Sequence, residues 1–285
     1  MKKWLPYPIV FFAVLMIGIW YMESLKTVPS ITYFPENETN QFRSASTTLN
    51  LVPGKDSSSH ISWQTKSTTD KPAYLRQDIT FLFANGELRG VHSSWKQHVR
   101  TLSYGLSLPA REDAFWQSIS LHHAEIHESP DSITGIQQST ADKLYVYTDA
   151  SKEHSFHAPN SKGEKEIQTK LQHLTSQRLE SNWSELARHF GLQLHDYIVF
   201  GLTDLQKYET SALPGMGQKQ THEIVGKLWE GIYKNYLLPA VKYKQNGLTS
   251  HMPCILLDTK NSEIIVLFDF NGKPYKLIQQ IPPQN

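Results

Sequence analysis

The stretch "RQDITFLFANGELRGVHSS", residues 76–94, predicts a β-hairpin. Ile79, Phe81 and Phe83 occupy alternate positions, and the side-chain period of two in a strand places all three on one face. The pair "NG" at 85–86 follows, and both residue types tolerate the positive φ angles that a two-residue hairpin turn requires. The sequence therefore predicts two antiparallel strands that bury one face.

The same signature recurs near the C-terminus, where a second "NG" pair lies at 271–272. Runs of β-branched and aromatic residues surround it and are separated by turn residues. They predict a β-meander of three short antiparallel strands, at about 253–258, 263–269 and 274–281.

Two segments between these regions carry helical periodicity. Residues 163–191 place apolar side chains at helical spacing and end at a glycine, with a break expected at Asn182. Residues 218–238 repeat apolar side chains every four positions, and Pro239 is expected to end that helix. Two further strands are expected, at 143–149 and 196–202.

The densest group of candidate functional side chains is "SLHHAEIHES", residues 120–129, with three histidines and two glutamates. A helix over 107–129 is favoured, because a serine can cap it, a proline lies early, and apolar residues recur at helical spacing. In that helix His122 points to the core, and His123 and His127 lie one turn apart on its flank.

The alternative conformation for the same residues is a strand. His123, Glu125 and His127 then alternate onto one face, with about 6.6 Å between neighbours. In either conformation His122, His123, Glu125 and His127 are the candidate ligand or partner surface, sensitive to pH near the histidine pKa of about 6.5. The simpler interpretation is structural, with histidines at the edge of the core that hydrogen-bond to backbone or carboxylates.

A zinc site is the alternative interpretation of these histidines. The H-E-x-x-H motif of zinc proteases needs a glutamate directly after the first histidine, and here Ala124 holds that position. That family is therefore excluded. A different site remains, in which His123 and His127 bind zinc together with His154 and His157. The sequence contains no GxSxG, CxxC or GxGxxG pattern, and no cofactor is predicted.

A membrane anchor is predicted at the N-terminus. Residues 4–22 carry no charge, and a helix of that length spans about 28 Å, close to a hydrocarbon core of about 30 Å. The run is longer than the apolar region of a cleaved signal peptide and lacks small residues for cleavage. Lys2 and Lys3 precede it, so the N-terminus is expected in the cytoplasm and the rest of the chain outside.

The predicted fold class is α+β, with β-hairpins, about three helices and the C-terminal meander. Residues 1–3 form a short cytoplasmic end and residues 4–22 the anchor. Residues 23–72, rich in serine and threonine, are interpreted as a stalk with one strand in "HISWQT". Residues 73–285 form the extracytoplasmic region, which as an alternative divides near residue 160.

Charge and cysteine content restrict the function further. The chain holds 28 basic and 27 acidic residues, two of the basic ones before the anchor, so the outer region has no basic excess to bind nucleic acid. The single cysteine, Cys254, cannot form an intrachain disulfide and is expected to be buried. An outward-facing domain without disulfides is more typical of a bacterium than of a eukaryotic secretory pathway.

These features together predict a membrane-anchored extracytoplasmic binding, accessory or regulatory protein. Its partners are the lipid bilayer, through residues 4–22, and a protein or cell-surface ligand. The alternative is a metal-dependent extracytoplasmic hydrolase that uses the histidines of residues 122–127.

Overall fold

The computed structural model describes residues 31–54, 59–110, 112–129, 131–150, 152–243, 247–260 and 262–282. The predicted cytoplasmic end, 1–3, and the predicted anchor, 4–22, lie outside these residues. Within the described ranges no helix is both long and apolar enough to cross a membrane. Residues 31–285 form one compact unit, which includes the proposed dividing point near residue 160.

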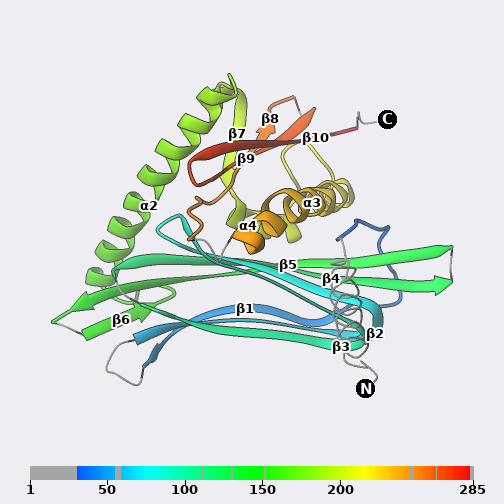
Figure 1. Ribbon diagram of the computed structural model, residues 1–285, viewed down its shortest axis with the longest axis horizontal. Coiled ribbons are helices and arrows are strands. Elements are labelled where there is room, and N and C mark those ends of the chain that lie inside the picture. The colour runs from blue at the N-terminus through cyan, green and yellow to red at the C-terminus, as the bar shows by residue number, and fades with distance from the viewer. Residues whose placement is uncertain are drawn as a thin grey trace, which may run out of the picture. The chain divides into compact units, whose positions relative to one another are not determined.

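A six-stranded antiparallel sheet forms the first half of this unit (Figure 1). Its path is β1-β2-β4-β5-β6, and β3 pairs with β2. The strands are β1 (Phe42–Pro53), β2 (Ser59–Ala84), β3 (Glu87–Pro109), β4 (Ala114–Ser129), β5 (Ser132–Asp149) and β6 (Lys152–Phe156).

The long strand β2 pairs with β3 along most of its length, but its other neighbour changes from β1 to β4 part-way along. Its first half lies between β1 and β3, and its second half lies between β3 and β4, with a register shift between Thr68 and Ala73. The first half and β1 therefore fold beneath β4 and β5 (Figure 1). Trp63 on β2 packs against Trp116 on β4 and Leu144 on β5 in the core between these two layers.

Helices and a second sheet form the other half of the unit. Their order is α2 (Lys162–His189), η1 (Leu194–Asp196), β7 (Tyr197–Gly201), η2 (Leu202–Glu209), α3 (Gln218–Ile232), the π-helical turn η3 (Tyr233–Leu237), α4 (Leu238–Tyr243), β8 (Cys254–Asp258), β9 (Glu263–Phe270) and β10 (Lys273–Gln280). The second sheet is an antiparallel meander of β7, β8, β9 and β10.

The largest core lies where α3 and η3 pack between the two sheets (Figure 1). Alternation along β9 shows why both faces of the second sheet are covered. Val266 and Phe268 face this core, whereas Ile265 and Leu267 pack with Leu186 of α2 on the opposite face. The α+β class is thus confirmed.

Both Asn-Gly hairpins are confirmed. Asn85 and Gly86 have φ angles of 50° and 82°, and the flanking residues Ala84 and Glu87 pair. Asn271 and Gly272 have φ angles of 51° and 74°, between β9 and β10. The three C-terminal strands lie where the sequence predicts them, as do those at 143–149 and 196–202, although β5 begins well before residue 143.

The helix expected over 107–129 is wrong, because residues 114–129 form β4. Strand β4 packs into a core on each of its two faces, with Ile119 and Leu121 on one side and Trp116 on the other, so its sequence does not alternate cleanly between apolar and polar residues. Phe115 and Ile119, four residues apart, share a face in a strand as well as in a helix. The spacing that favoured the helix therefore did not distinguish the two conformations.

The stalk expected over 23–72 is wrong for residues 31–72, most of which belong to β1 and β2. Several of its hydroxyl side chains, among them Thr47 and Thr65, are buried and bonded to hydroxyls of other strands. The Ser/Thr-rich composition therefore reflects a polar sheet interior.

Two smaller corrections concern the helices: α2 continues unbroken through Asn182, and Pro239 lies inside α4 after a π-helical turn that accommodates its missing N–H.

Candidate functional site

A cavity of about 90 Å³ lies between the first sheet and α3. We call it the inner cavity. Strands β4 and β5 form its floor, η2 and α3 form its walls, and residues 33–36 close one side. Its lining includes Tyr33, Phe34, Glu36, Leu121, His123, Gln137, Ser139, Tyr208, Glu209, His222, Gly226 and Trp229.

A second, larger hollow of about 730 Å³ shares Tyr33, Glu36 and His222 with the inner cavity. We call it the outer cleft. Exposed residues, including Glu38 and Lys219, form most of its lining. The inner cavity is therefore a small chamber that continues into a wider cleft at the surface.

Residues 31–37 are held as one wall by backbone hydrogen bonds. The amide of Asn37 donates to the Gly135 carbonyl and the amide of Gly135 donates to the Pro35 carbonyl, both at 2.9 Å. The Tyr33 amide donates to the Glu230 carboxylate on α3 at 3.1 Å. This segment thus connects β5 and α3 across the edge of the cavity.

His123 reaches the inner cavity because odd-numbered residues of β4 face α3. It lies in register with Gln77 on β2 and Gln137 on β5, so three polar side chains lie side by side across this face of the sheet. The Gln137 amide nitrogen lies 3.3 Å from His123 Nδ1. With the Gln137 amide in this orientation, Nδ1 accepts the hydrogen bond and the N–H of His123 is on Nε2.

Two buried N–H groups in the lining have no hydrogen-bond partner among the described residues. They are Nε2 of His123 and Nε1 of Trp229, and both side chains are at least 99% buried. The nearest carboxylate to His123 Nε2 is Glu125 Oε1 at 3.6 Å, which is too long for a hydrogen bond. A buried donor without a partner costs about 1–3 kcal/mol. Both nitrogens have almost no accessible surface, so they lie within the packing beside the cavity.

A third polar group, the Glu209 carboxyl, enters the cavity from η2. Its Oε1 accepts a hydrogen bond from the Ser139 amide at 2.7 Å. Burial raises the pKa of Glu209, and the hydrogen bonds from Ser139 and the charge of His222 oppose this shift only in part. The cavity lining therefore includes a carboxyl that binds its proton more readily than a solvated one.

The four residues proposed from the sequence separate onto two faces of β4. His123, Glu125 and His127 share one face, as the strand alternative predicts, and Glu125 lies 3.6 Å from His123 and 3.5 Å from His127. His127 stacks on Tyr74 with ring centroids 3.7 Å apart. His122 points to the opposite face, into the folded sheet.

The proposed zinc site is not assembled. On β5, the residue opposite His123 is Gln137, and the residue opposite His154 is Tyr147. These two positions on β5 are ten residues apart. At about 3.3 Å per residue this separates the pairs by about 33 Å. His157 lies just beyond β6, near Asp142. In the described parts of the chain, no group of three or more His, Cys, Asp or Glu side chains is arranged to hold a metal ion.

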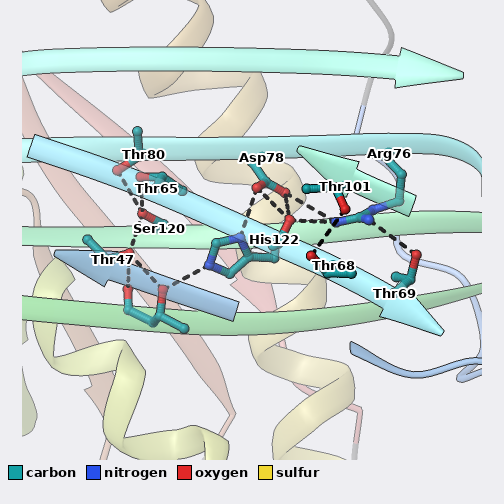
Figure 2. Close-up of polar contacts among 12 residues, drawn as sticks. Thr47, Thr65, Thr68, Thr69, Arg76, Asp78, Thr80, Thr101, Ser120 and His122 are labelled. Carbon is teal, nitrogen blue, oxygen red and sulfur yellow. Dashed lines mark hydrogen bonds and ion pairs between the residues drawn. The ribbon is translucent and has the colours of Figure 1, made fainter. Parts of the chain in front are cut away.

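His122 belongs to a buried polar network inside the folded sheet (Figure 2). Its Nδ1 lies 3.1 Å from Asp78 Oδ2, and its Nε2 lies 2.8 Å from Thr140 Oγ1. Thr140 in turn contacts Thr47 of β1 at 2.6 Å, and Thr47 bonds Ser120 of β4 at 2.6 Å. Side chains from four strands are thereby linked.

Arg76 and Ser67 extend the network (Figure 2). Ser67 donates to both oxygens of Asp78, at 3.0 and 2.7 Å, and the Arg76 guanidinium lies 3.8 Å from the same carboxylate. Arg76 also donates to the Arg100 carbonyl and to Thr69. Burial lowers the pKa of Arg76, and the charge of Asp78 opposes this.

The order Asp78, His122, Thr140 is that of an acid, a base and a hydroxyl nucleophile, but its setting is structural. A nucleophile must face a substrate. Here His122 and Asp78 are buried, neither described cavity includes any of the three residues, and the Thr140 hydroxyl is bonded to Thr47. The network therefore holds the layers of the sheet together.

Cys254 is also buried, as predicted, and burial raises the pKa of its thiol.

Comparisons with protein-family models, curated proteins and solved structures find no match to this chain. The cavity residues that the sequence left unidentified, Gln137, Glu209, His222 and Trp229, come from three separate elements, β5, η2 and α3. None of them forms a local motif, so only the tertiary arrangement reveals them.

Replacement of Asp78 by alanine is expected to lower the free energy of unfolding by about 3–5 kcal/mol, because it leaves the buried Arg76 charge without its partner. Asp70→Ala is the matched control, since Asp70 pairs with Arg43 at 3.5 Å on the surface of the same sheet. That change should cost about 1 kcal/mol or less. Urea denaturation measures both, and equal losses would contradict the assigned role of the network.

Replacement of Glu209 by glutamine is expected to change how stability depends on pH. Because the folded-state pKa is raised above its ordinary value of 4.5, the folded protein binds this proton more tightly than the unfolded chain. The associated stability is present below that ordinary value and is lost as pH rises through the folded-state pKa. As pH rises from the ordinary value of 4.5 through the folded-state pKa, the free energy of unfolding of wild type should therefore fall relative to that of Glu209→Gln. Urea titrations at a series of pH values measure both. Glu180→Gln, at an exposed position of α2, controls for the lost charge, and identical curves for both variants would refute the prediction.

Proposed function

We propose that this chain is a membrane-anchored binding protein that acts at the outer face of a bacterial membrane, with the inner cavity as its ligand site. The observation that carries the proposal is the cavity itself, in which the aromatic residues Tyr33 and Tyr208 and the polar residues Gln137 and Glu209 line one space between the first sheet and α3.

The location rests on the sequence. The uncharged run at residues 4–22 is long enough for a bilayer, and Lys2 and Lys3 orient it with the following region outside. The folded unit also needs no disulfide, since its only cysteine is buried in a core.

A binding role is favoured over the alternative of a metal-dependent hydrolase. His154 and His157 lie far from His123 and His127, so the proposed ligand set does not converge. The inner cavity instead combines aromatic walls with a few polar groups, the usual composition of a small-molecule site.

The membrane orientation can be tested by cysteine labelling, because the natural Cys254 is buried and gives a low background. Leu174→Cys places a thiol at an exposed position of α2. A membrane-impermeant maleimide should label it in intact cells, after removal of any outer wall. Lys2→Cys should be labelled only after lysis, and the reverse pattern would overturn the orientation.

Ligand binding can be tested by native mass spectrometry of the full-length protein purified from the membranes of its host. A Cβ at Gly226 would lie 2.4 Å from the Tyr33 ring and 2.8 Å from Gln137 Oε1. Gly226→Ala should therefore crowd the cavity and lose a small molecule that wild type retains. Gly217→Ala, at the residue directly before α3 and with no atom within 4 Å of the added Cβ, should retain it. If wild type carries no bound species, the proposed site is refuted.

A further inference from the structure

We infer that His251 is a pH-sensitive clamp between the two sheets, which holds them together most tightly when its imidazole carries a proton. The clamp joins β9 of the second sheet to the turn of the β2–β3 hairpin in the first. His251 does not line the inner cavity, so this role is independent of the proposed ligand.

The segment before β8 pairs with the β2–β3 hairpin through its backbone. The Met252 amide donates to the Gly86 carbonyl at 2.8 Å, and Glu87 and His251 form an antiparallel bridge. We call this contact the joint. Because residues opposite each other in an antiparallel pair direct their side chains to the same side, the His251 imidazole projects on the same side as the Glu87 carboxylate.

A buried carboxylate of the second sheet holds the same histidine. The backbone amide and the Nδ1 atom of His251 each lie 3.1 Å from Oδ1 of Asp269 on β9. The Asp269 side chain is 5% exposed and that of His251 is 29% exposed. Against an ionised carboxylate Nδ1 is the donor, so the proton that His251 gains or loses with pH is on Nε2. The partial exposure of the ring leaves this proton able to exchange with solvent.

The charged side chains around the joint lack one positive charge when His251 is neutral. Three carboxylates and two guanidiniums lie around it, from Asp269, Glu87, Glu112, Arg89 and Arg178. Both arginines pair with Glu87, and Arg89 also pairs with Glu112. Tyr236 donates to the His251 carbonyl and stays uncharged, because burial raises its pKa. A proton on His251 therefore balances the cluster, and its attraction is greatest to the buried Asp269, where solvent screens least.

The pKa shifts of the pair have the direction that this geometry requires. The hydrogen bond to Asp269 raises the pKa of His251 above its ordinary value of 6.5, and burial opposes this only in part. The charge of Glu87 adds to the increase, and that of Arg178 opposes it. Burial disfavours an ionised Asp269, but hydrogen bonds from His251 hold the pKa of this carboxyl below its ordinary value. The folded protein therefore binds the His251 proton more tightly than the unfolded chain does.

The sign of the pH dependence follows from this difference. The associated stability is present below the ordinary pKa of 6.5 and is lost as pH rises through the folded-state pKa of His251. Separation of the joint would release His251 and return its pKa to the ordinary value. Each unit of the pKa shift then corresponds to about a tenfold change in the equilibrium for opening. Mildly acidic pH closes the joint, and alkaline pH loosens it.

Two measurements on the full-length protein in detergent micelles test this role. The first is an NMR titration of the His251 imidazole, assigned by its absence in His251→Asn. Its pKa should lie above 6.5 in wild type and move toward 6.5 in Asp269→Asn, which keeps the size of the side chain but removes its charge. A wild-type pKa at or below 6.5 would overturn the inference, whether or not the variants fold.

The second measurement is hydrogen exchange at the Met252 amide, which donates across the joint. Its protection factor, corrected for the intrinsic effect of pH on exchange, should fall as pH rises from 6.5 through the folded-state pKa of His251. The fall should be about tenfold for each unit of the pKa shift found by NMR. His251→Asn can still donate to Asp269 but does not titrate, so its protection factor should stay constant. A fall of equal size in that variant would assign the effect to another group and overturn the clamp.

His195→Asn is the matched control. His195 also pairs with an aspartate, Asp196 at 3.5 Å, but its side chain is 79% exposed and lies on η1, which adjoins the opposite end of β8. This change should leave the protection of the Met252 amide and its pH dependence as in wild type. Equal effects of the two histidine changes would contradict a clamp at His251.

Discussion

The position of β4 between β2 and β5 is the constraint on which the rest of the structure depends. Because a strand directs successive side chains to opposite faces, the adjacent residues His122 and His123 enter different environments. His122 completes the polar network with Asp78 and Thr140 inside the folded sheet. His123 lines the cavity beneath α3. One strand therefore contributes both to the stability of the sheet and to the candidate binding site.

The polar interior explains why the sequence between residues 31 and 72 resembles a stalk. In most sheets a buried face is apolar, but here hydroxyls from β1, β2, β4 and β5 bond to one another inside the fold. Such a network is costly when any member lacks a partner, and it specifies the register of the strands when all are paired. A composition rich in serine and threonine cannot distinguish this arrangement from a solvated linker.

Local signals in the sequence predicted the parts of the fold that local chemistry controls. The Asn-Gly turns at residues 85–86 and 271–272, the C-terminal meander and the long helices follow from backbone preferences and side-chain periodicity. Strand β4 was predicted only as the alternative to a helix, because its apolar spacing fits both conformations and only burial on two faces decides between them. For the site, the sequence identified His123 but not Glu209 or Trp229, which reach it from η2 and α3.

The central claim is that the inner cavity binds a small molecule. The most direct measurement is the indole N–H resonance of Trp229, which lines this cavity, in an NMR spectrum of the ¹⁵N-labelled protein, assigned by its absence in Trp229→Phe. This resonance should move when the small molecule that copurifies with the protein is removed and return when it is added back, while that of Trp116, which lies in the core inside the folded sheet, stays in place. A Trp229 resonance that is the same with and without the bound molecule would contradict the account.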